Sequence, residues 1–137
     1  MLIDSRLRFS NAQAITATAD STSHLDMGTA NNIGKGEPMF LVVLLTVAPD
    51  NANGNETYEY VLESDDNASF SSATDIVTIA GVAGSPAGHK HVVSVPYSNE
   101  RYLQMRYTLG GTTPSVTITS FLTNQEPESW EAFPDAI

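Results

Sequence analysis

The feature that most restricts the fold of this chain is a short apolar run, MFLVVLLTV, at residues Met39 to Val47. Gly36 and Pro38 bound the run on one side, and Pro49 bounds it on the other. The run is rich in β-branched residues and too short for a typical buried helix. Because apolar residues fill consecutive positions, we predict a central strand that is buried on both faces.

Other segments alternate apolar and polar residues, and turn-forming residues separate them. No segment of useful length has helical periodicity, so the pattern predicts an all-β fold. We expect a single-domain antiparallel β-sandwich, jelly-roll-like rather than immunoglobulin-like. The predicted strands are Leu7–Phe9, Ala14–Ala19, Ser23–Leu25, Met39–Val47, Thr57–Glu63, Asp75–Ala80, His91–Val95, Arg101–Leu109 and Ser115–Leu122.

Two turn sequences predict hairpins. Asp50 to Asn55 (DNANGN) contains an Asn-Gly pair, which tolerates positive φ, and it follows the apolar run. Gly110 and Gly111 follow the most regular alternating segment, and Ser115 to Leu122 is predicted to return as its partner. The inward residues of this hairpin would be Leu103, Met105, Tyr107, Leu109, Val116 and Ile118.

The segment Thr57 to Glu63 (TYEYVLE) has two distinct faces. Tyr58, Tyr60 and Leu62 share one face because successive side chains of a strand alternate. Glu59 and Glu63 share the other face with Val61, and we expect that face to be largely solvated.

Composition restricts the partners and the chemistry. The chain has 137 residues, the size of one domain, and its formal net charge of -10 should repel nucleic acid and anionic lipid. It has no cysteine, which excludes disulfides, thiolate chemistry and Cys-ligated zinc. The first residues carry charge in place of an apolar signal core, and no segment has membrane-spanning length. We expect a soluble protein that is made in a cytosol.

The last residues differ from the rest of the chain. We divide the chain into a sandwich domain, residues 1–123, and an acidic arm, residues 124–137. The arm has no basic residue and contains Trp130, the only tryptophan, and Phe133. These aromatic residues either dock into grooves of a partner or fold back on the sandwich as a cap.

Candidate chemical sites are weak. His89 and His91 would project from one strand face and could meet a metal, but no spacing supplies further ligands. Oxygen-bearing residues cluster at 50–56 and at 65–75. The first cluster lacks the register of an EF-hand calcium loop, and turn chemistry explains both clusters. Glu59 and Glu63 lie on a predicted solvated face, where glycosidase chemistry has no support. We predict no catalytic residue, no metal and no cofactor.

Ordered blocks of the sequence resemble a known family. The blocks are LRFSNAQAITATADSTSHLDMGTANNIGKGEPMFLVV, YEYVLESDDNASFSSATDIVTI and VPYSNERYLQMRYTLGGTTPSVTITSFLT, and together they cover about residues 2 to 123. They are similar to the phage capsid cement (decoration) protein family typified by a Bordetella phage. The resemblance implies a jelly-roll-like sandwich on the outer capsid surface of a virion. It implies bridging of neighbouring major capsid proteins, often as a homo-oligomer, with no enzyme activity.

Such a protein could contact the capsid through an edge strand or through a terminal arm. The predicted interface residues are Leu7, Phe9, Trp130 and Phe133. An alternative function is a carbohydrate-binding or receptor-binding module of a virion, in which Tyr97 and Tyr102 would stack on sugars. A sandwich enzyme with a metal at His89 and His91 is a third hypothesis.

Overall fold

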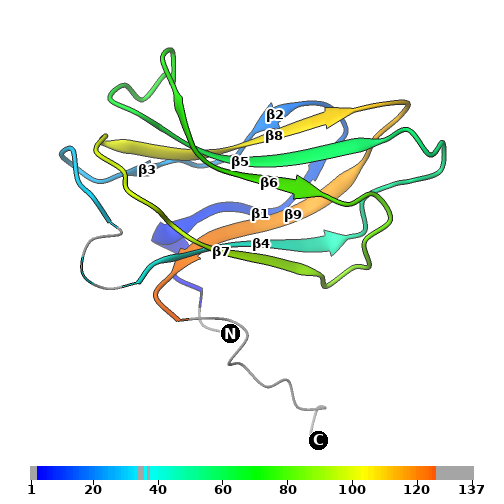
Figure 1. Cartoon of the computed structure of the whole chain (residues 1–137), viewed down its shortest axis with the longest axis horizontal. Coiled ribbons are helices and arrows are strands. Elements are labelled where there is room, and N and C mark those ends of the chain that lie inside the picture. Colours follow the sequence, from blue (N-terminus) through cyan, green and yellow to red (C-terminus); the bar gives the residue numbers. More distant parts are fainter. Residues whose placement is uncertain (1–2, 34–35, 37, 126–137) are drawn as a thin grey trace, which may run out of the picture.

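A computed structural model describes residues 3–33, 36 and 38–125, and it consists of two antiparallel sheets packed face to face (Figure 1). The prediction of an all-β sandwich is confirmed, whereas jelly-roll connectivity stays a prediction. A short 3-10 helix, η1, precedes the first strand. The elements are η1 (Ser5–Leu7), β1 (Arg8–Ile15), β2 (Ala19–Asp20), β3 (Leu25–Asp26), β4 (Phe40–Val47), β5 (Thr57–Asp65), β6 (Thr74–Gly81), β7 (Lys90–Ser94), β8 (Tyr102–Gly110) and β9 (Val116–Thr123).

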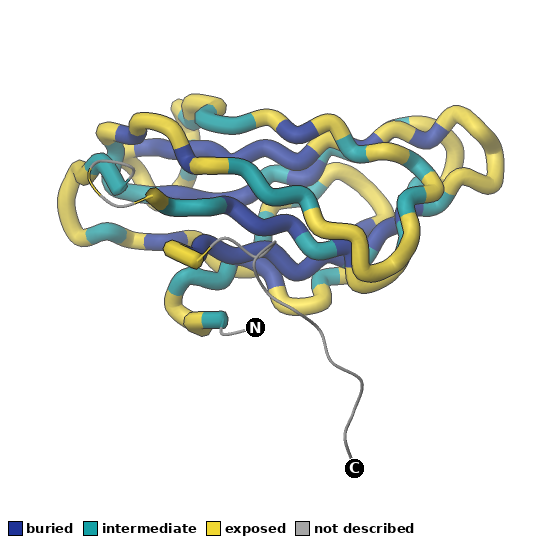
Figure 2. Tube along the Cα trace, turned by 60° about the horizontal axis from the view of Figure 1, so that its bottom comes forward, coloured by how far each residue is buried: buried dark blue, intermediate teal, exposed yellow. Residues whose placement is uncertain are grey.

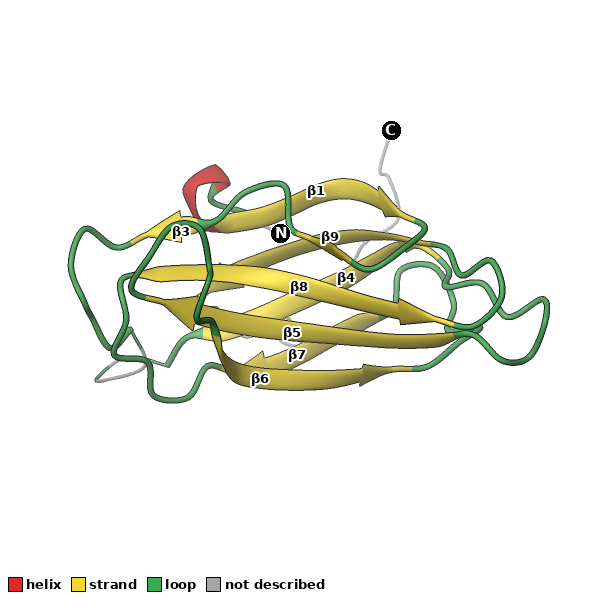
Figure 3. Cartoon of the chain, turned by 90° about the horizontal axis from the view of Figure 1, so that it is seen from above, coloured by secondary structure: helices red, strands yellow, loops and turns green. Residues whose placement is uncertain are grey.

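The strand order places segments that are distant in sequence side by side. The four-stranded sheet has the order β1-β9-β4-β7, and the five-stranded sheet has the order β2-β8-β5-β6, with β3 also paired to β8. Viewed from above, the five-stranded sheet covers the four-stranded sheet (Figure 3). Only two of the consecutive strand pairs, β2 with β3 and β5 with β6, lie in the same sheet, so most connections cross between the layers.

The core lies between the sheets, where alternation along each strand directs one set of apolar side chains inward. The buried residues are concentrated along the middle of the strands, and the loops are exposed (Figure 2). The predicted inward residues of β8 and β9 are confirmed, except that Leu109 is only half-buried. The buried core cluster contains Phe9, Ile15, Leu25, Leu41, Val43, Leu45, Tyr58, Tyr60, Leu62, Ile79, Val95, Leu103, Met105, Tyr107, Val116, Ile118 and Leu122.

A buried tyrosine joins the two sheets through the core. The Tyr107 hydroxyl on β8 is 2.7 Å from the Ser10 hydroxyl on β1 and 2.6 Å from the Ser120 hydroxyl on β9. Burial raises the pKa of Tyr107 to about 12, so the phenol stays protonated and can share its hydrogen bonds with both serines. The hydrogen-bonded contact therefore fixes the two layers relative to each other.

Both predicted hairpins are wrong. β8 and β9 lie in different sheets, and so do β4 and β5, so each connection turns a corner of the sandwich. The Tyr58 hydroxyl donates to the Asp50 carbonyl at 2.9 Å and lies 3.2 Å from the Ser115 carbonyl, which ties the two corners together. The turns themselves were predicted, but β8 pairs with β5 and β9 pairs with β1 and β4, so the apolar sides of β8 and β9 face each other across the core.

Candidate interaction surface

The outer face of the five-stranded sheet, here called the polar face, carries a network of charged side chains. Glu63 on β5 is only 2% exposed, and it accepts hydrogen bonds from Arg106 and, at 3.0 Å, from the Gln104 amide. The second guanidinium nitrogen of Arg106 lies 3.2 Å from Asp75 on β6. The prediction of a largely solvated face here is wrong for Glu63, because neighbouring strands supply partners that cover its carboxylate.

A second ion pair lies at one end of the same face. Arg101 donates from Nε to Asp26 at 2.6 Å, and its guanidinium lies 4.9 Å from the centre of the Tyr102 ring. The hydrogen bond from Arg101, followed by the backbone N–H of Gly28, lowers the pKa of Asp26 to about 2. The arginines of the polar face are therefore occupied by carboxylates of the same molecule.

The outer face of the four-stranded sheet, here called the apolar face, is defined by Phe40, Val42, Leu44, Val92 and Phe121. Val42 has Val92 on one side and Phe121 on the other, and alternation along β4 places Phe40 and Leu44 on the same face as Val42. Val42 is 0% and Phe121 1% exposed, and the other three are half-buried. The expectation that the apolar run is buried on both faces therefore holds at its centre.

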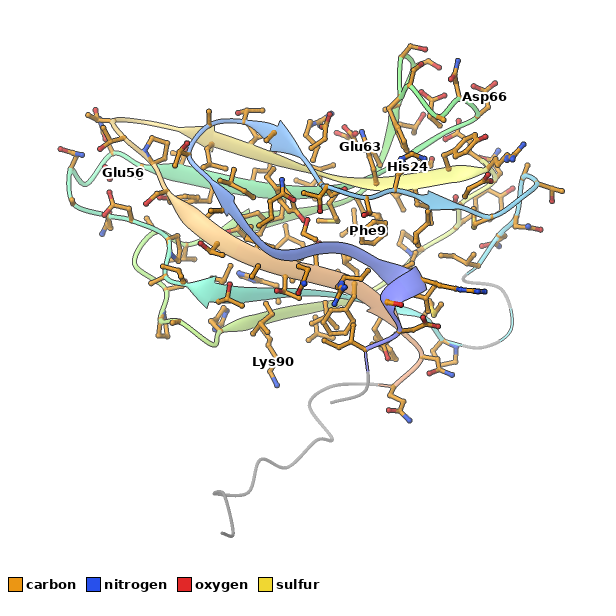
Figure 4. All side chains as sticks on the ribbon, turned by 180° about the vertical axis from the view of Figure 1, so that it is seen from behind. Phe9, His24, Glu56, Glu63, Asp66 and Lys90 are labelled. Atoms are coloured by element: carbon orange, nitrogen blue, oxygen red, sulfur yellow. The ribbon has the colours of Figure 1, made fainter. Side chains whose placement is uncertain are left out.

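Two cations flank the apolar face. Arg8 lies opposite Phe121 in the β1–β9 pairing, and Lys90 lies opposite Leu44 in the β4–β7 pairing. The Lys90 side chain points away from the sandwich on this side (Figure 4). Among residues 3–33, 36 and 38–125, neither cation has an ion-pair partner. The apolar face thus combines buried and half-buried apolar side chains with two cations that have no ion-pair partner within the described ranges.

An open pocket lies at the end of the sandwich, where β3, β4, β8 and β9 meet. Its volume is about 290 Å³, and its walls are mainly apolar. Its polar lining comes from Arg6, His24 and Asp26, and Asp26 is already held by Arg101. The apolar wall consists of Leu7, Leu25, Met27, Ile33, Met39, Leu103 and Leu122. Such a pocket suits an apolar group rather than proton transfer.

The histidine pair lies at the edge of the four-stranded sheet. The ring centres of His89 and His91 are 4.7 Å apart, and His91 packs 5.7 Å from the buried Tyr60 ring. Burial, and then the nearby His89, lower the pKa of His91, which favours a neutral imidazole. Within the described residues no group of three or more His, Asp or Glu side chains could hold a metal.

The acidic turn residues have structural partners. The Asp65 carboxylate accepts hydrogen bonds from the backbone N–H groups of Asn67, at 3.0 Å, and Ser72, at 2.8 Å. Glu56 accepts from the backbone N–H groups of Asn53 and Asn55. These oxygens close turns, as the turn interpretation of both clusters expects.

The structure separates the predicted interface residues. Phe9 is 0% exposed between the sheets (Figure 4), so a partner would reach it only if β1 moved. Leu7 is half-buried in the wall of the end pocket. Trp130 and Phe133 lie outside the described residues. Sequence reasoning missed the apolar face, although the consecutive apolar residues of β4 were a signal for it.

In the described residues, no helix has the length and apolar character to cross a membrane. The fold and its faces define the chain as a two-sheet antiparallel β-sandwich with one ion-paired face and one apolar, cationic face. The family model Bbp16 matches residues 9–122, which is most of the chain. The chain therefore belongs to the Bbp16 family, a Bordetella phage protein family. No curated protein matches it.

Proposed function

We propose that this protein is a capsid cement protein that binds the outer surface of a tailed-phage head and bridges neighbouring major capsid proteins. Its membership of a phage protein family carries the proposal, and a virion protein is consistent with that family. The apolar face supports a role in surface contact, because a partner that covers its half-buried side chains would remove further apolar surface from water.

Bridging would stabilise the head by mass action. A protein that binds only the assembled shell adds its binding free energy to that state and leaves free subunits unaffected. Many copies act on one shell, so weak individual contacts are sufficient when each copy touches more than one subunit. A homo-oligomer, either a dimer or a trimer, would increase this avidity.

The proposal includes no chemical reaction and no cofactor. The net charge of -10 opposes binding to nucleic acid and to anionic membranes, and it is compatible with binding to a protein surface. Tyr97 is 69% exposed and favours the alternative, a carbohydrate-binding or receptor-binding module of the virion. Tyr102 supports that alternative less, because Arg101 and His24 already contact its ring.

Co-sedimentation with phage heads tests the proposal. Heads lacking this protein are mixed with the purified chain, and the pelleted protein is measured against added protein. We expect saturable binding and a higher temperature for DNA release from the decorated heads. Absence of binding would contradict the proposal. Binding to a glycan array that is lost on Tyr97→Ala, without binding to heads, would favour the alternative.

A further inference from the structure

The side chain of His91 points into the core from an edge strand. β7 lies last in the strand order β1-β9-β4-β7, and His91 lies opposite the fully buried Val43 of β4. Residues that lie opposite each other share one face of a sheet, so the His91 ring is directed between the sheets, where it packs against Tyr60. The neighbouring Lys90 points the other way, out of the sandwich (Figure 4).

The site of the His91 ring is suited to a neutral imidazole. Its Nε2 atom is buried and has no hydrogen-bond partner in the part of the chain that the structure describes. A protonated imidazole carries a hydrogen on both ring nitrogens, so protonation would bury a charge together with an N–H group that has no acceptor. Protonation of His91 is therefore opposed as long as β7 stays in place.

The charges around His91 oppose its protonation as well. The ring of the exposed His89 is centred 4.7 Å away, and its positive form repels a second positive ring. β4 carries no titratable side chain, and β5 presents only the phenol of Tyr60, whose pKa is raised by burial, so that it stays uncharged. The carboxylates of β5 and β6 belong to the polar face, on the far side of their sheet: Glu59, Glu63, Asp65 and Asp75.

β7 is the element that can respond to this charge. It has five residues, and among the described strands it pairs with β4 alone. Two backbone hydrogen bonds continue that pairing beyond its ends, from Leu45 to the His89 carbonyl at 2.9 Å and from Val95 to the Met39 carbonyl at 2.8 Å. A short strand at a sheet edge opens locally at a lower free energy than the central strands do.

We propose that His91 is an acid-sensitive switch for β7: the strand stays paired with β4 while the imidazole is neutral, and protonation releases the strand while the rest of the sandwich remains folded. Because Val92 lies on β7, the apolar face is incomplete in the released form. The inference concerns the isolated chain and does not depend on the cement role.

The direction of the effect follows from proton linkage. With β7 paired, the pKa of His91 lies below its ordinary value of 6.5, and release of the strand into water restores that value. The released form therefore binds the proton more tightly, and acid favours it. Between the two pKa values, the equilibrium constant for release rises by up to about tenfold for each pH unit that is lost.

Hydrogen exchange of the backbone amides tests the proposal, with each rate corrected for the pH dependence of exchange in an unfolded chain. From pH 7.5 to pH 5, we expect the β7 amides that bond to β4 to lose protection several-fold, and the amides of β8 to keep theirs. Unchanged protection of β7 would overturn the proposal. An equal loss in β8 would also overturn it, because the whole sandwich would then be opening.

The chain has three histidines, so matched variants can assign the effect. His91→Phe keeps an aromatic ring beside Tyr60 and removes the titrating group, and we expect β7 protection to become equal at the two pH values. His24→Gln removes an exposed histidine between β2 and β3, and it should behave as the wild type. Loss of β7 protection in acid that persists in His91→Phe, or that His24→Gln abolishes, would contradict the assignment.

A titration of the wild type keeps the test decisive if His91→Phe disturbs folding. The imidazole C–H resonances of the three histidines are followed by NMR as the pH is lowered. We expect His91 to titrate at a lower pH than His24 and His89, and His89→Gln to raise its midpoint, because the neighbouring charge is gone. A His91 midpoint at or above 6.5 would refute the proposal.

Discussion

Arg106 on the five-stranded sheet touches two carboxylates of its own sheet, whereas Arg8 and Lys90 on the four-stranded sheet touch none among the described residues. The apolar side chains differ in the same way. Val61 on the polar face has Arg106 and Thr78 beside it, while Val42 on the apolar face has Val92 and Phe121 beside it. The polar face thus pairs its arginines with its own carboxylates, whereas the apolar face carries cations without a carboxylate partner in the described ranges.

The comparison shows that the two outer faces of one sandwich can treat their charged side chains differently. A sheet needs only one face for the core, so the two outer faces can differ in composition. Here the polar face uses ion pairs to bury Glu63, and further contacts would gain little there. On the apolar face Phe40, Leu44 and Val92 are only half-buried, so covering them would remove further hydrocarbon from water.

The largest effect on stability is expected when one partner of the buried ion pair on the polar face is removed. Arg106→Ala leaves the buried carboxylate of Glu63 without its cation, and the free energy of unfolding should fall by about 3 kcal/mol. Urea denaturation followed by circular dichroism measures the change. A loss below about 1 kcal/mol would mean that water reaches Glu63 and screens it.

A smaller effect is expected at the hydrogen bonds that join the two sheets. Tyr107→Phe removes the hydroxyl that contacts Ser10 and Ser120, and we expect a loss of about 1 to 2 kcal/mol in thermal or urea unfolding. Tyr60→Phe is the matched control, because the Tyr60 hydroxyl is buried without a hydrogen-bond partner in the described residues. That control should be neutral or stabilising, and equal losses would refute the assignment.

Acid should weaken the polar face through Asp26. Its pKa is lowered to about 2, so the ionised carboxylate stabilises the folded state at pH values above its unfolded pKa of about 3.9. The contribution decreases as the pH falls towards 2. We therefore expect the stability difference between the wild type and Asp26→Asn to be full at pH 5 and to shrink by pH 2. A pH-independent difference would contradict the Arg101 contact as its cause.

The smallest effects are expected at the cations of the apolar face. Arg8→Ala and Lys90→Ala remove charges without an ion-pair partner in the described residues, so each should change the free energy of unfolding by less than about 0.5 kcal/mol. The same denaturation assay as for Arg106→Ala gives the comparison. A loss as large as that of Arg106→Ala would show that the two faces are equally self-satisfied.

Local sequence patterns were sufficient for most of the strands. The alternation in Arg101 to Leu109 predicted β8 with its inward side chains, and the apolar run predicted β4 at the interior of a sheet. The first strand was predicted as Leu7 to Phe9 but extends to Ile15, past Ala12 with a positive φ of 48°. Small residues in that stretch carry too weak a periodicity to reveal a strand.

Interactions between distant residues could not be predicted in the same way. Glu63 appeared solvated because nothing near it in sequence indicates a partner, and its cover comes from Arg106, 43 positions away. Likewise, Gly110 and Gly111 allow a tight turn, but they do not determine whether the next strand joins the same sheet or the opposite sheet. That choice depends on which pairing buries the most apolar surface in the whole molecule.

The sequence by itself determined that this chain is an acidic all-β domain with a buried apolar strand. Strand periodicity depends only on neighbouring residues, and net charge is a sum over all residues, so neither requires knowledge of the fold. Only the tertiary structure decided that β4 and β9 lie side by side and collect Phe40, Val42, Leu44 and Phe121 on one outer face. Strand pairing joins residues that are far apart along the chain, and this pairing brings carboxylates to the arginines of one face and gathers apolar side chains on the other.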